Sequence, residues 1–560
     1  MRILVMQTTR MGDVIQTSPL IRVLRTKHPD AHIALMVRNM GKAVAQHNPD
    51  VDEVIVYEED EMFNATRAQD SERLLSAYRR AEEEIRRLKN DRYDVVYNCT
   101  HSIASAMLIK LAESPLVVGA HLSDDWQFVL RGPWINYFFT SVFHREHNDL
   151  NLCDITQRFA EDAAPCHHLV LKTTDEDHAF VQDLLEEHGI GPEDFLVCFQ
   201  LGASEESKRW SEAHFAGLAR LLAEKRNAKI MLVGVKEEAI LGEIFVRHAP
   251  GIAIPLFGKT SVPQLAALLE RANLLVTNDT GTMHIAAAVD CPIVLVSVGY
   301  VHFRETGPYG EGHCAIERRR SQLGRADGVP DGLKERVEMR PEQVLRAIEI
   351  TLAARRDGPV AQMEKDPELS DVDVFMTRVA ADGCLQWYPV LRRPLAETDF
   401  LRIAYRTAWL ERLGAQVDPE VERDSVKTML RYYLSPGHDD VEQWRRDLTS
   451  VFAGLAEVAR RGIRLTEPLL AHLSGKRNLR KARQLVEELR RIDDEMRIYG
   501  ELHSQCKPLV LISRYERDNL EGADPIRLAE TTLQIYDDCQ VRAMLTAAKI
   551  DEVAACCLNG

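Results

Sequence analysis

The chain has 560 residues, 45% of them hydrophobic and 28% charged, which is ordinary for a folded protein and enough for about three or four domains. Its formal net charge of −16 argues against a nucleic-acid-binding protein, because such proteins usually present a basic face. No apolar run reaches the ~20 residues that a membrane span needs, and Met1–Met6 is too short for a signal peptide. We expect a cytoplasmic protein, with peripheral contact to the inner face of a membrane left open.

Eleven cysteines are scattered along the chain without any CxxC pair. This pattern is typical of reduced cytosolic thiols and not of a disulfide framework. Cys153, Cys166, His167 and His168 lie close together in sequence, but their spacing matches no zinc pattern. We predict no metal site and no bound cofactor.

The first part of the chain alternates short apolar segments, rich in β-branched residues, with segments of helical periodicity such as Pro19–Lys27 and Glu72–Lys89. Apolar strands that alternate with helices are typical of a parallel sheet covered on both faces. We therefore predict a Rossmann-like domain over residues 1–165. Its expected strands are Ile3–Gln7, His32–Val37, Val54–Tyr57, Asp94–Asn98 and Leu116–Gly119.

The alternation begins again after Cys166–Pro192, a polar and partly helical segment that we interpret as a hinge region. A second Rossmann-like domain is predicted over residues 166–356. Two such domains in tandem predict a ligand cleft between the carboxyl ends of their sheets. The expected strands are Phe195–Gln200, Lys229–Gly234, Leu274–Asn278 and Ile293–Ser297, with Gly251–Gly258 as a further candidate.

The character of the sequence changes after Glu317. Pro341–Arg355 has a helical pattern and Asp357–Ser370 resembles a linker, while Pro508–Ser513 is a candidate strand within a mostly helical stretch. We predict a mainly helical domain of unknown role over residues 371–560. Its expected helices are Phe400–Leu413, Glu420–Leu434, Val441–Arg461, Leu479–Tyr499 and Pro525–Tyr536.

The loop after the first strand has the sequence TTRMGDVIQTSP and leads into a helix. Gly12 permits a tight turn. Asp13 is expected at the mouth of the cleft near a helix N-terminus, where capping is the ordinary role of an aspartate. The loop is neither a GxGxxG dinucleotide fingerprint nor a phosphate-binding P-loop, because it has one glycine and no Gly-Lys-Ser/Thr.

A second polar loop, FQLGASEESKRW, ends the first strand of the second domain. Lys208 and Arg209 precede the helix expected from about Ser211. Free N–H groups and the helix dipole favour an anion at such a place. A solvated pair of surface cations is the alternative interpretation.

The segment TNDTGTMHIAA joins the strand Leu274–Asn278 to a helix of small residues. Thr280, Gly281 and Thr282 could present amides and hydroxyls to a diphosphate. His284, one turn into the helix, could equally be a core or capping histidine. The later loop Phe303–Gly310 is expected to border the same cleft.

Together, the segments MGDVIQTSP, SKRW, NDTGTMH and GPYG resemble, in order and sheet position, the heptosyltransferases of lipopolysaccharide core assembly, glycosyltransferase family 9. The resemblance covers roughly residues 1–350. It implies a GT-B fold of two facing Rossmann-like domains, an ADP-heptose-like donor and an inverting transfer without a metal. It also implies a glycan or glycolipid acceptor.

The resemblance further assigns roles to particular residues. Asp13 matches the general base that takes the proton of the acceptor hydroxyl, and Lys208 matches the lysine that faces the donor diphosphate. Glu237 or Glu238 falls where the family places an acidic residue on the ribose. The other implied donor-binding residues are Thr9, Gly12, Arg209, Asp279, Thr280, Gly281, Thr282 and His284.

One segment departs from the family pattern. Tyr57–Met62 is strongly acidic where members that use an anionic acceptor are rich in Arg and Lys, which puts the usual acceptor in doubt. Arg131 and Arg145 are candidates for an anionic acceptor, and the aromatic stretch Trp126–Phe143 is expected to pack and not to contact lipid. A protein acceptor is the alternative, and a non-catalytic GT-B scaffold with a partner-recruiting extension is the second. A sugar-nucleotide epimerase fits the motifs poorly.

Overall fold

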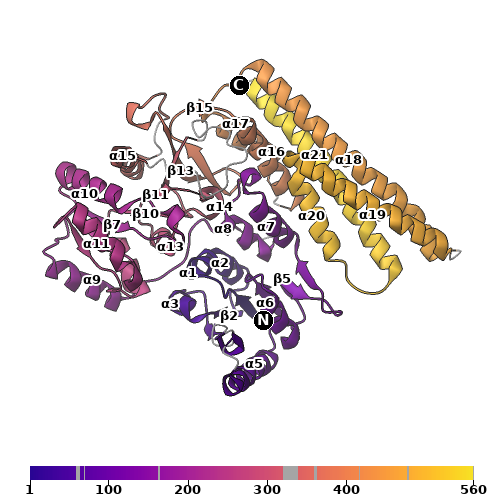
Figure 1. Cartoon of the computed structure of the whole chain (residues 1–560), viewed down its shortest axis with the longest axis horizontal. Helices are drawn as coiled ribbons and strands as arrows, with labels where there is room; N and C mark the ends of the chain where they lie inside the picture. Colours follow the sequence, from indigo (N-terminus) through magenta and orange to yellow (C-terminus); the bar gives the residue numbers. More distant parts are fainter. Residues whose placement is uncertain are drawn as a thin grey trace. The chain divides into compact units, whose positions relative to one another are not determined.

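The computed structural model describes residues 1–58, 64–67, 70–161, 164–299, 301–319, 339–358, 362–414, 417–475 and 478–558. These residues form two mainly parallel sheets with covering helices, followed by a set of long helices (Figure 1). Most of the acidic segment Tyr57–Met62 lies outside the described residues.

The first sheet has six strands in the order β3-β2-β1-β4-β5-β6. All neighbours with a printed register are parallel except β5 and β6, which form an antiparallel hairpin. The five predicted strands are confirmed, and β6 was not predicted. The strands are β1 (Arg2–Met6), β2 (His32–Val37), β3 (Glu53–Val56), β4 (Val95–Asn98), β5 (Val117–Leu122) and β6 (Phe128–Arg131).

Helices follow the strands of this sheet as a parallel arrangement requires. The longest, α5, begins where the side chain of Asp70 accepts hydrogen bonds from the backbone N–H groups of Glu72 and Arg73. The helices are α1 (Met11–Gln16), α2 (Ser18–Lys27), α3 (Lys42–Gln46), α5 (Ser71–Asp91), α6 (Ile103–Ala112), α7 (Pro133–Phe143) and α8 (Leu152–Gln157).

The second sheet has eight strands in the order β14-β13-β12-β11-β10-β7-β8-β9. The strands β7 to β12 form its parallel part, and β13 and β14 add to it antiparallel. The strands are β7 (Leu196–Gln200), β8 (Lys229–Val233), β9 (Ala253–Pro255), β10 (Leu274–Thr277), β11 (Ile293–Ser297), β12 (Cys314–Arg318), β13 (Val372–Val379) and β14 (Leu385–Pro389).

The last three of these strands differ from the sequence-based expectation, which placed a loop after Glu317 and a helical domain from residue 371. Cys314 of β12 lies opposite Met376 of β13, so the pairing partner is distant in sequence and leaves no local signal. The chain returns to the sheet through helix α15 (Pro341–Asp357). The other helices of this part are α9 (Asp175–Glu187), α10 (Glu212–Arg226), α11 (Ala239–His248), α12 (Val262–Arg271), α13 (Gly281–Ala288) and α14 (Phe303–Thr306).

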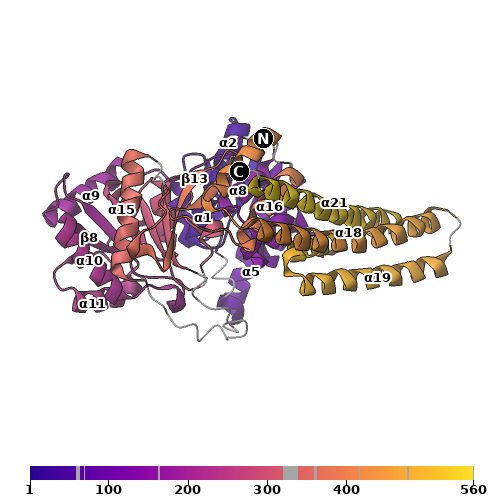
Figure 2. The same ribbon diagram turned by 90° about the horizontal axis from the view of Figure 1, so that it is seen from above.

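The C-terminal part is helical from Glu397 onward. Its longest helices, α18 and α21, pack along each other, and α19 packs on α18 (Figures 1 and 2). Within the described residues no helix is both long and apolar enough to span a membrane. The helices are α16 (Glu397–Arg412), α17 (Pro419–Leu430), α18 (His438–Ser474), α19 (Leu479–Leu502), α20 (Lys507–Asp518) and α21 (Pro525–Leu558).

The candidate strand Pro508–Ser513 is wrong, because this segment lies in helix α20. A short apolar run does not distinguish a strand from a buried helix turn. Pro508 stands at the helix start, where proline is favoured, and Leu509 and Ile512 share the buried face.

Packing divides the chain into two compact units, which differ from the predicted boundaries. One unit consists of Met1–Met6, Glu59–Leu150 and Pro394–Gly560, and the other of Gln7–Glu58 and Asn151–Arg393. The helical extension therefore belongs to the same unit as α7. The first loop belongs with the second sheet.

Within the first unit, α16 and α20 cover the aromatic face of α7. The ring centroids of Tyr137 and Trp409 are 5.0 Å apart, and those of Phe139 and Tyr515 are 5.9 Å apart. These rings of the aromatic stretch pack as predicted. Phe143, at the end of α7, is 66% exposed.

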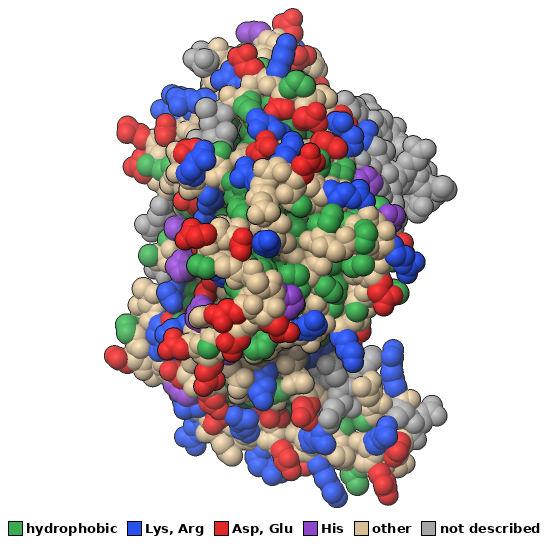
Figure 3. Space-filling model, turned by 90° about the vertical axis from the view of Figure 1, so that its left-hand side faces the viewer, with side chains coloured by type: hydrophobic (Ala, Val, Ile, Leu, Met, Phe, Trp, Pro, Cys, Tyr) green, Lys and Arg blue, Asp and Glu red, His purple; other side chains and the backbone are tan. Residues whose placement is uncertain are grey.

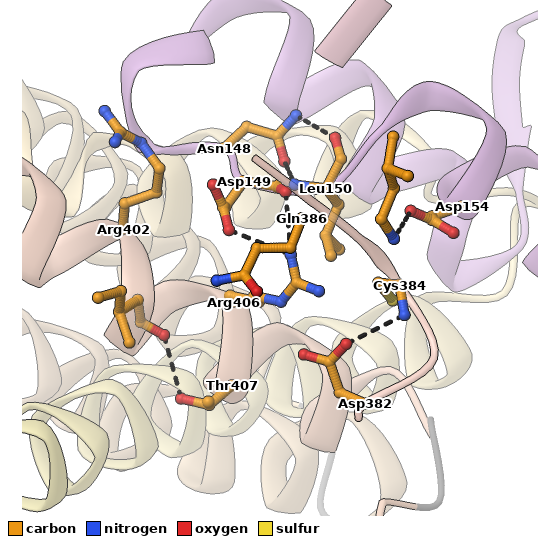
Figure 4. A network of polar contacts seen from close by, with 12 residues as sticks. Asn148, Asp149, Leu150, Asp154, Asp382, Cys384, Gln386, Arg402, Arg406 and Thr407 are labelled. Atoms are coloured by element: carbon orange, nitrogen blue, oxygen red, sulfur yellow. Dashed lines mark hydrogen bonds and ion pairs between the residues drawn. The ribbon is translucent and has the colours of Figure 1, made fainter. Parts of the chain in front are cut away.

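Two arginines of α16 anchor the loop that follows α7. Arg406 is fully buried, and its Nη1 lies 3.1 Å from Oδ2 of Asp149 (Figure 4). Arg402 donates to the carbonyl oxygen of Glu146 and pairs with Asp399 at 2.7 Å. Buried charges need such partners, so the fit between α16 and this loop is specific.

Candidate functional site

The candidate site lies within the second unit, where the N-terminal turns of α1 and α13 meet. A Cβ on Gly12 would lie 3.0 Å from Cδ2 of His284 and 3.7 Å from Cα of Gly281. A Cβ on Gly281 would lie 3.0 Å from Cε of Met11. Glycine at both positions lets the two backbones approach closely, so the structure brings together two motifs that the sequence analysis singled out separately.

Asp13 lies in the first turn of α1. Its Oδ2 accepts hydrogen bonds from Oγ1 of Thr9, at 2.8 Å, and from the backbone N–H of Arg10, at 3.1 Å. The same hydroxyl lies 2.6 Å from Oε1 of Gln7, so its single proton is shared between the two acceptors. The aspartate thus caps its own turn, as the ordinary interpretation expected, and these bonds also fix the orientation of its carboxylate.

His284 lies in the first turns of α13 and is 6% exposed. Burial lowers the pKa of His284, and the carboxylates of Asp279 and Asp13 partly oppose that shift. Its Nδ1 is buried and has no hydrogen-bond partner among the described residues. The imidazole is therefore neutral at pH ~7.

The N-terminus of α13 provides donors for an anion. Thr280 is the N-cap residue, and its side chain does not cap the helix; its Oγ1 lies 3.2 Å from Oγ1 of Thr277. The first N–H groups of a helix have no partner within the helix and carry the positive end of its dipole. Gly281 and Thr282 are the first two residues of α13.

Lys208 pairs with Asp279, which directly precedes the N-cap residue of α13. The Nζ of Lys208 lies 3.7 Å from Oδ2 of Asp279, and each side chain is 21% exposed. Nη2 of Arg209 instead lies 3.8 Å from Oε2 of Glu206, three residues earlier in the sequence. Of the two predicted cations, the structure therefore places Lys208 beside Asp279, which precedes the N-terminus of α13.

Asn278 joins the two loops, a role that the sequence did not predict. It is fully buried; its Oδ1 accepts from the backbone N–H of Trp210, at 2.9 Å, and its Nδ2 donates to the carbonyl of Leu201, at 2.8 Å. Trp210 is buried and donates to the carbonyl of Met339, at 2.8 Å. A polar residue at the end of a buried strand was the signal that could have identified this anchor.

Glu238 and Glu237 differ in their hydrogen bonds and in their exposure. Glu238 accepts hydrogen bonds from Nε2 of Gln200, at 3.0 and 3.2 Å, and from the backbone N–H of Val235. Oε1 of Gln200 in turn lies 3.5 Å from Oγ1 of Thr282. Gln200 thus links Glu238 to the start of α13, whereas Glu237 is exposed.

The loop around Tyr309 was expected to border the cleft, but its tyrosine is buried in the protein. Tyr309 is 1% exposed, and its hydroxyl lies 2.8 Å from Oδ1 of Asp154 and 2.9 Å from the carbonyl of Cys166. Burial raises the pKa of Tyr309 well above its ordinary value. Oδ2 of Asp154 accepts from the backbone N–H of Leu385, at 2.8 Å (Figure 4), so this loop anchors α8 and β14.

The two acceptor candidates, Arg131 and Arg145, belong to the first unit and not to the unit that holds Asp13. Arg131 pairs with Glu521, Nη2 to Oε2 at 3.0 Å, and Arg145 begins a short 3₁₀ helix that packs on α16. Arg131 therefore contacts the helical extension through Glu521, and the 3₁₀ helix that contains Arg145 packs on the same extension.

Across the described ranges, no group of three or more His, Cys, Asp or Glu side chains could hold a metal ion. On the face shown in Figure 3, acidic and basic side chains are interspersed.

Comparison with known proteins gives consistent matches. Residues 83–322 match the model of glycosyltransferase family 9 (heptosyltransferase), a range that contains Lys208, Asp279 and His284 but not Asp13. Lipopolysaccharide heptosyltransferase 1 of Escherichia coli O18:K1:H7 is 26% identical over 341 residues, which are 60% of this chain and 98% of that protein. Lipooligosaccharide heptosyltransferase 2 of Haemophilus ducreyi is 25% identical over 313 residues, 53% of this chain and 83% of the relative.

A solved structure is also similar. The family 9 glycosyl transferase from Veillonella parvula DSM 2008 superposes with a TM-score of 0.51 and 23% identity, covering 63% of this chain and 97% of its own. The predicted GT-B fold with an added helical part is thereby confirmed. None of these three matches extends over the whole chain, so each leaves a large part of it without a counterpart. Residues 83–322 of the chain therefore resemble glycosyltransferase family 9, the heptosyltransferase family.

Proposed function

We propose that this glycosyltransferase moves heptose, or a closely related sugar, from an ADP-activated donor to a glycan or glycolipid such as a lipopolysaccharide core, on the cytoplasmic side of a membrane. The observation that carries the proposal is the cluster of Asp13, Lys208, Asp279 and His284 around the N-terminus of α13. The names of the similar proteins support the choice of sugar and acceptor.

The donor diphosphate is assigned to the start of α13. The N–H groups of Gly281 and Thr282 and the hydroxyl of Thr280 would bind its oxygens, as helix N-termini commonly bind phosphate. Lys208 is only loosely held by Asp279, at 3.7 Å, so it can turn to the diphosphate when the donor binds. Glu238, linked to Thr282 through Gln200, would accept hydrogen bonds from the ribose hydroxyls.

The transfer would proceed in one displacement. Asp13 accepts the proton of the acceptor hydroxyl, whose oxygen forms a bond to the anomeric carbon while the bond from that carbon to the diphosphate breaks. The transition state resembles an oxocarbenium ion, and ADP leaves with growing negative charge. Lys208 and the amides of α13 stabilise that charge, and a single displacement inverts the anomeric configuration.

Thermal-shift measurement with ADP-, UDP-, GDP- and CMP-linked sugars tests the donor. A ligand that binds only the folded protein raises its melting temperature, so ADP-heptose should give the largest shift. A larger shift with another nucleotide contradicts the proposed donor. Product analysis with a heptose-deficient lipopolysaccharide core then tests the acceptor. Transfer to protein alone would show that the acceptor is a polypeptide and not a glycan.

A further inference from the structure

One end of the helical extension has a charge opposite to that of the whole protein. The sequence from Pro468 to Val486 contains five Lys or Arg residues and His472 but no Asp or Glu, in a chain of net charge −16. The described cations of this stretch are Arg480, Lys481 and Arg483 at the start of α19. We call these three residues, together with Leu479, the basic tip.

The cations of the basic tip are exposed. Across the described ranges, no ion pair involves Arg480, Lys481 or Arg483. Some other cations on the same helices are paired: Arg460 lies 2.7 Å from Glu457, and Arg490 lies 3.3 Å from Glu487. The positive charge of the tip is therefore available to a partner.

The position of these cations is unfavourable for the helix itself. Asn478 caps α19 by accepting from the backbone N–H of Lys481, at 3.1 Å, and the first turn contains no acidic residue. A helix N-terminus carries the positive end of the dipole, where cations destabilise and anions stabilise. Residues that break a local rule without a compensating contact point to a function outside the fold.

Apolar side chains accompany the charge on the outer face of α19. Leu479 is 66% exposed and Val486 is 40% exposed, and Arg483 lies between them at helical spacing, whereas Leu485 and Leu489 pack inward. Basic residues combined with exposed apolar residues on one helix face are typical of binding at a lipid–water interface. A purely polar ligand would make no favourable contact with the exposed apolar side chain of Leu479.

Helix α18 gives the tip a rigid support. It runs for 37 residues, about 55 Å, and its C-terminal end lies at the same end of the extension as the start of α19 (Figure 2). Its contacts with α21 and α19 hold it along most of its length. The tip is thus the end of a packed helical arm and not a loose tail.

We propose that the basic tip docks on a lipid bilayer with an anionic surface, its cations on the phosphate headgroups and Leu479 inserted at the acyl boundary. The binding concerns the extension alone and does not depend on the donor assigned above. Each Lys or Arg near an anionic membrane strengthens binding by several-fold, and the attraction decreases with salt.

The test is flotation of the full chain with vesicles of phosphatidylcholine alone or mixed with phosphatidylglycerol. The wild type should bind the mixed vesicles and should not bind the neutral ones. The variant Arg480→Glu/Lys481→Glu/Arg483→Glu should partition at least about 100-fold more weakly. The matched control Arg79→Glu/Lys225→Glu/Arg247→Glu makes the same change of net charge at exposed positions elsewhere and should bind like the wild type.

A second variant separates the apolar part from the charge. Leu479→Ser should weaken binding to mixed vesicles by about tenfold, because one leucine no longer enters the boundary. A far-UV circular dichroism spectrum and a cooperative thermal melt like those of the wild type show that each variant is folded. The proposal is overturned if the wild type does not bind mixed vesicles, if neutral vesicles bind it equally, or if the tip variant and the control behave alike.

Discussion

Gly12 lies so close to His284 that a Cβ on the glycine would be 3.0 Å from Cδ2 of the imidazole. The contact joins the first turn of α1 to the first turns of α13, two helices from distant parts of the sequence. It places the candidate base Asp13 and the candidate diphosphate-binding residues of α13 in one unit of the protein. The geometry of the site therefore depends on a glycine that has no functional group.

Replacing this glycine should disturb the site. Gly12→Ala is expected to destabilise the fold by about 1–3 kcal/mol, because the added methyl group overpacks a tight contact. It should also weaken nucleotide binding, which titration calorimetry measures. Gly191→Ala is the control, because its Cβ would meet only Oδ2 of Asp194, at 3.8 Å. Equal behaviour of the two variants would show that the contact is not tight in solution.

Asp13→Asn tests the general base. The variant should bind ADP with nearly the affinity of the wild type, because Asp13 is not assigned to the donor diphosphate. Its turnover should fall by about 10²–10⁴-fold, since the amide cannot accept the acceptor proton. Turnover and ADP affinity are measured on the same preparation. Near-normal turnover would leave Asp13 as a helix cap only.

Lys208→Ala tests the donor cation. Loss of a charge-assisted contact should weaken the binding of ADP by about 1.5–3 kcal/mol and slow the transfer. Arg209→Ala is the matched control, because Arg209 pairs with Glu206 and should leave ADP affinity nearly unchanged. If Arg209→Ala has the larger effect in titration calorimetry, the assignment of the two cations is reversed.

The buried His313 predicts a loss of stability in acid. Burial lowers its pKa from 6.5 to about 3, so below pH 6.5 the unfolded chain takes up a proton that the folded chain does not. Its contribution to stability is thus present above pH 6.5 and decreases as the pH falls. We expect His313→Gln to reduce the loss in unfolding free energy between pH 7 and pH 5 by about 2 kcal/mol. Urea denaturation measures this, and exposed His248→Gln should leave the loss unchanged.

Truncation tests the boundary between the second sheet and the helical extension. A chain that ends at Arg356 lacks β13 and β14, leaves the edge of β12 unpaired and should aggregate. A chain that ends at Arg393 retains the whole second unit and should still bind ADP, although α7 loses its cover. Soluble, ADP-binding protein from the shorter chain would show that β13 and β14 are dispensable.

The sequence alone determined the local structure well where hydrophobic periodicity is strong. The predicted strand His32–Val37 agrees with β2 at both ends, and the loops around Asp13, Lys208 and Thr280 follow strands as predicted. Buried parallel strands are continuous apolar runs, so they can be recognised without knowledge of their neighbours. The family resemblance rested on the same loops.

Only the tertiary structure decided questions that depend on distant contacts. It joined Glu238 to Gln200 by hydrogen bonds, placed Tyr309 on Asp154, and paired β13 with β12 after an intervening helix. It also made Pro508–Ser513 helical, because the run is too short for its period to decide. In each case the deciding partner is far away in sequence, and no local pattern of residues encodes which side chain or strand it will meet.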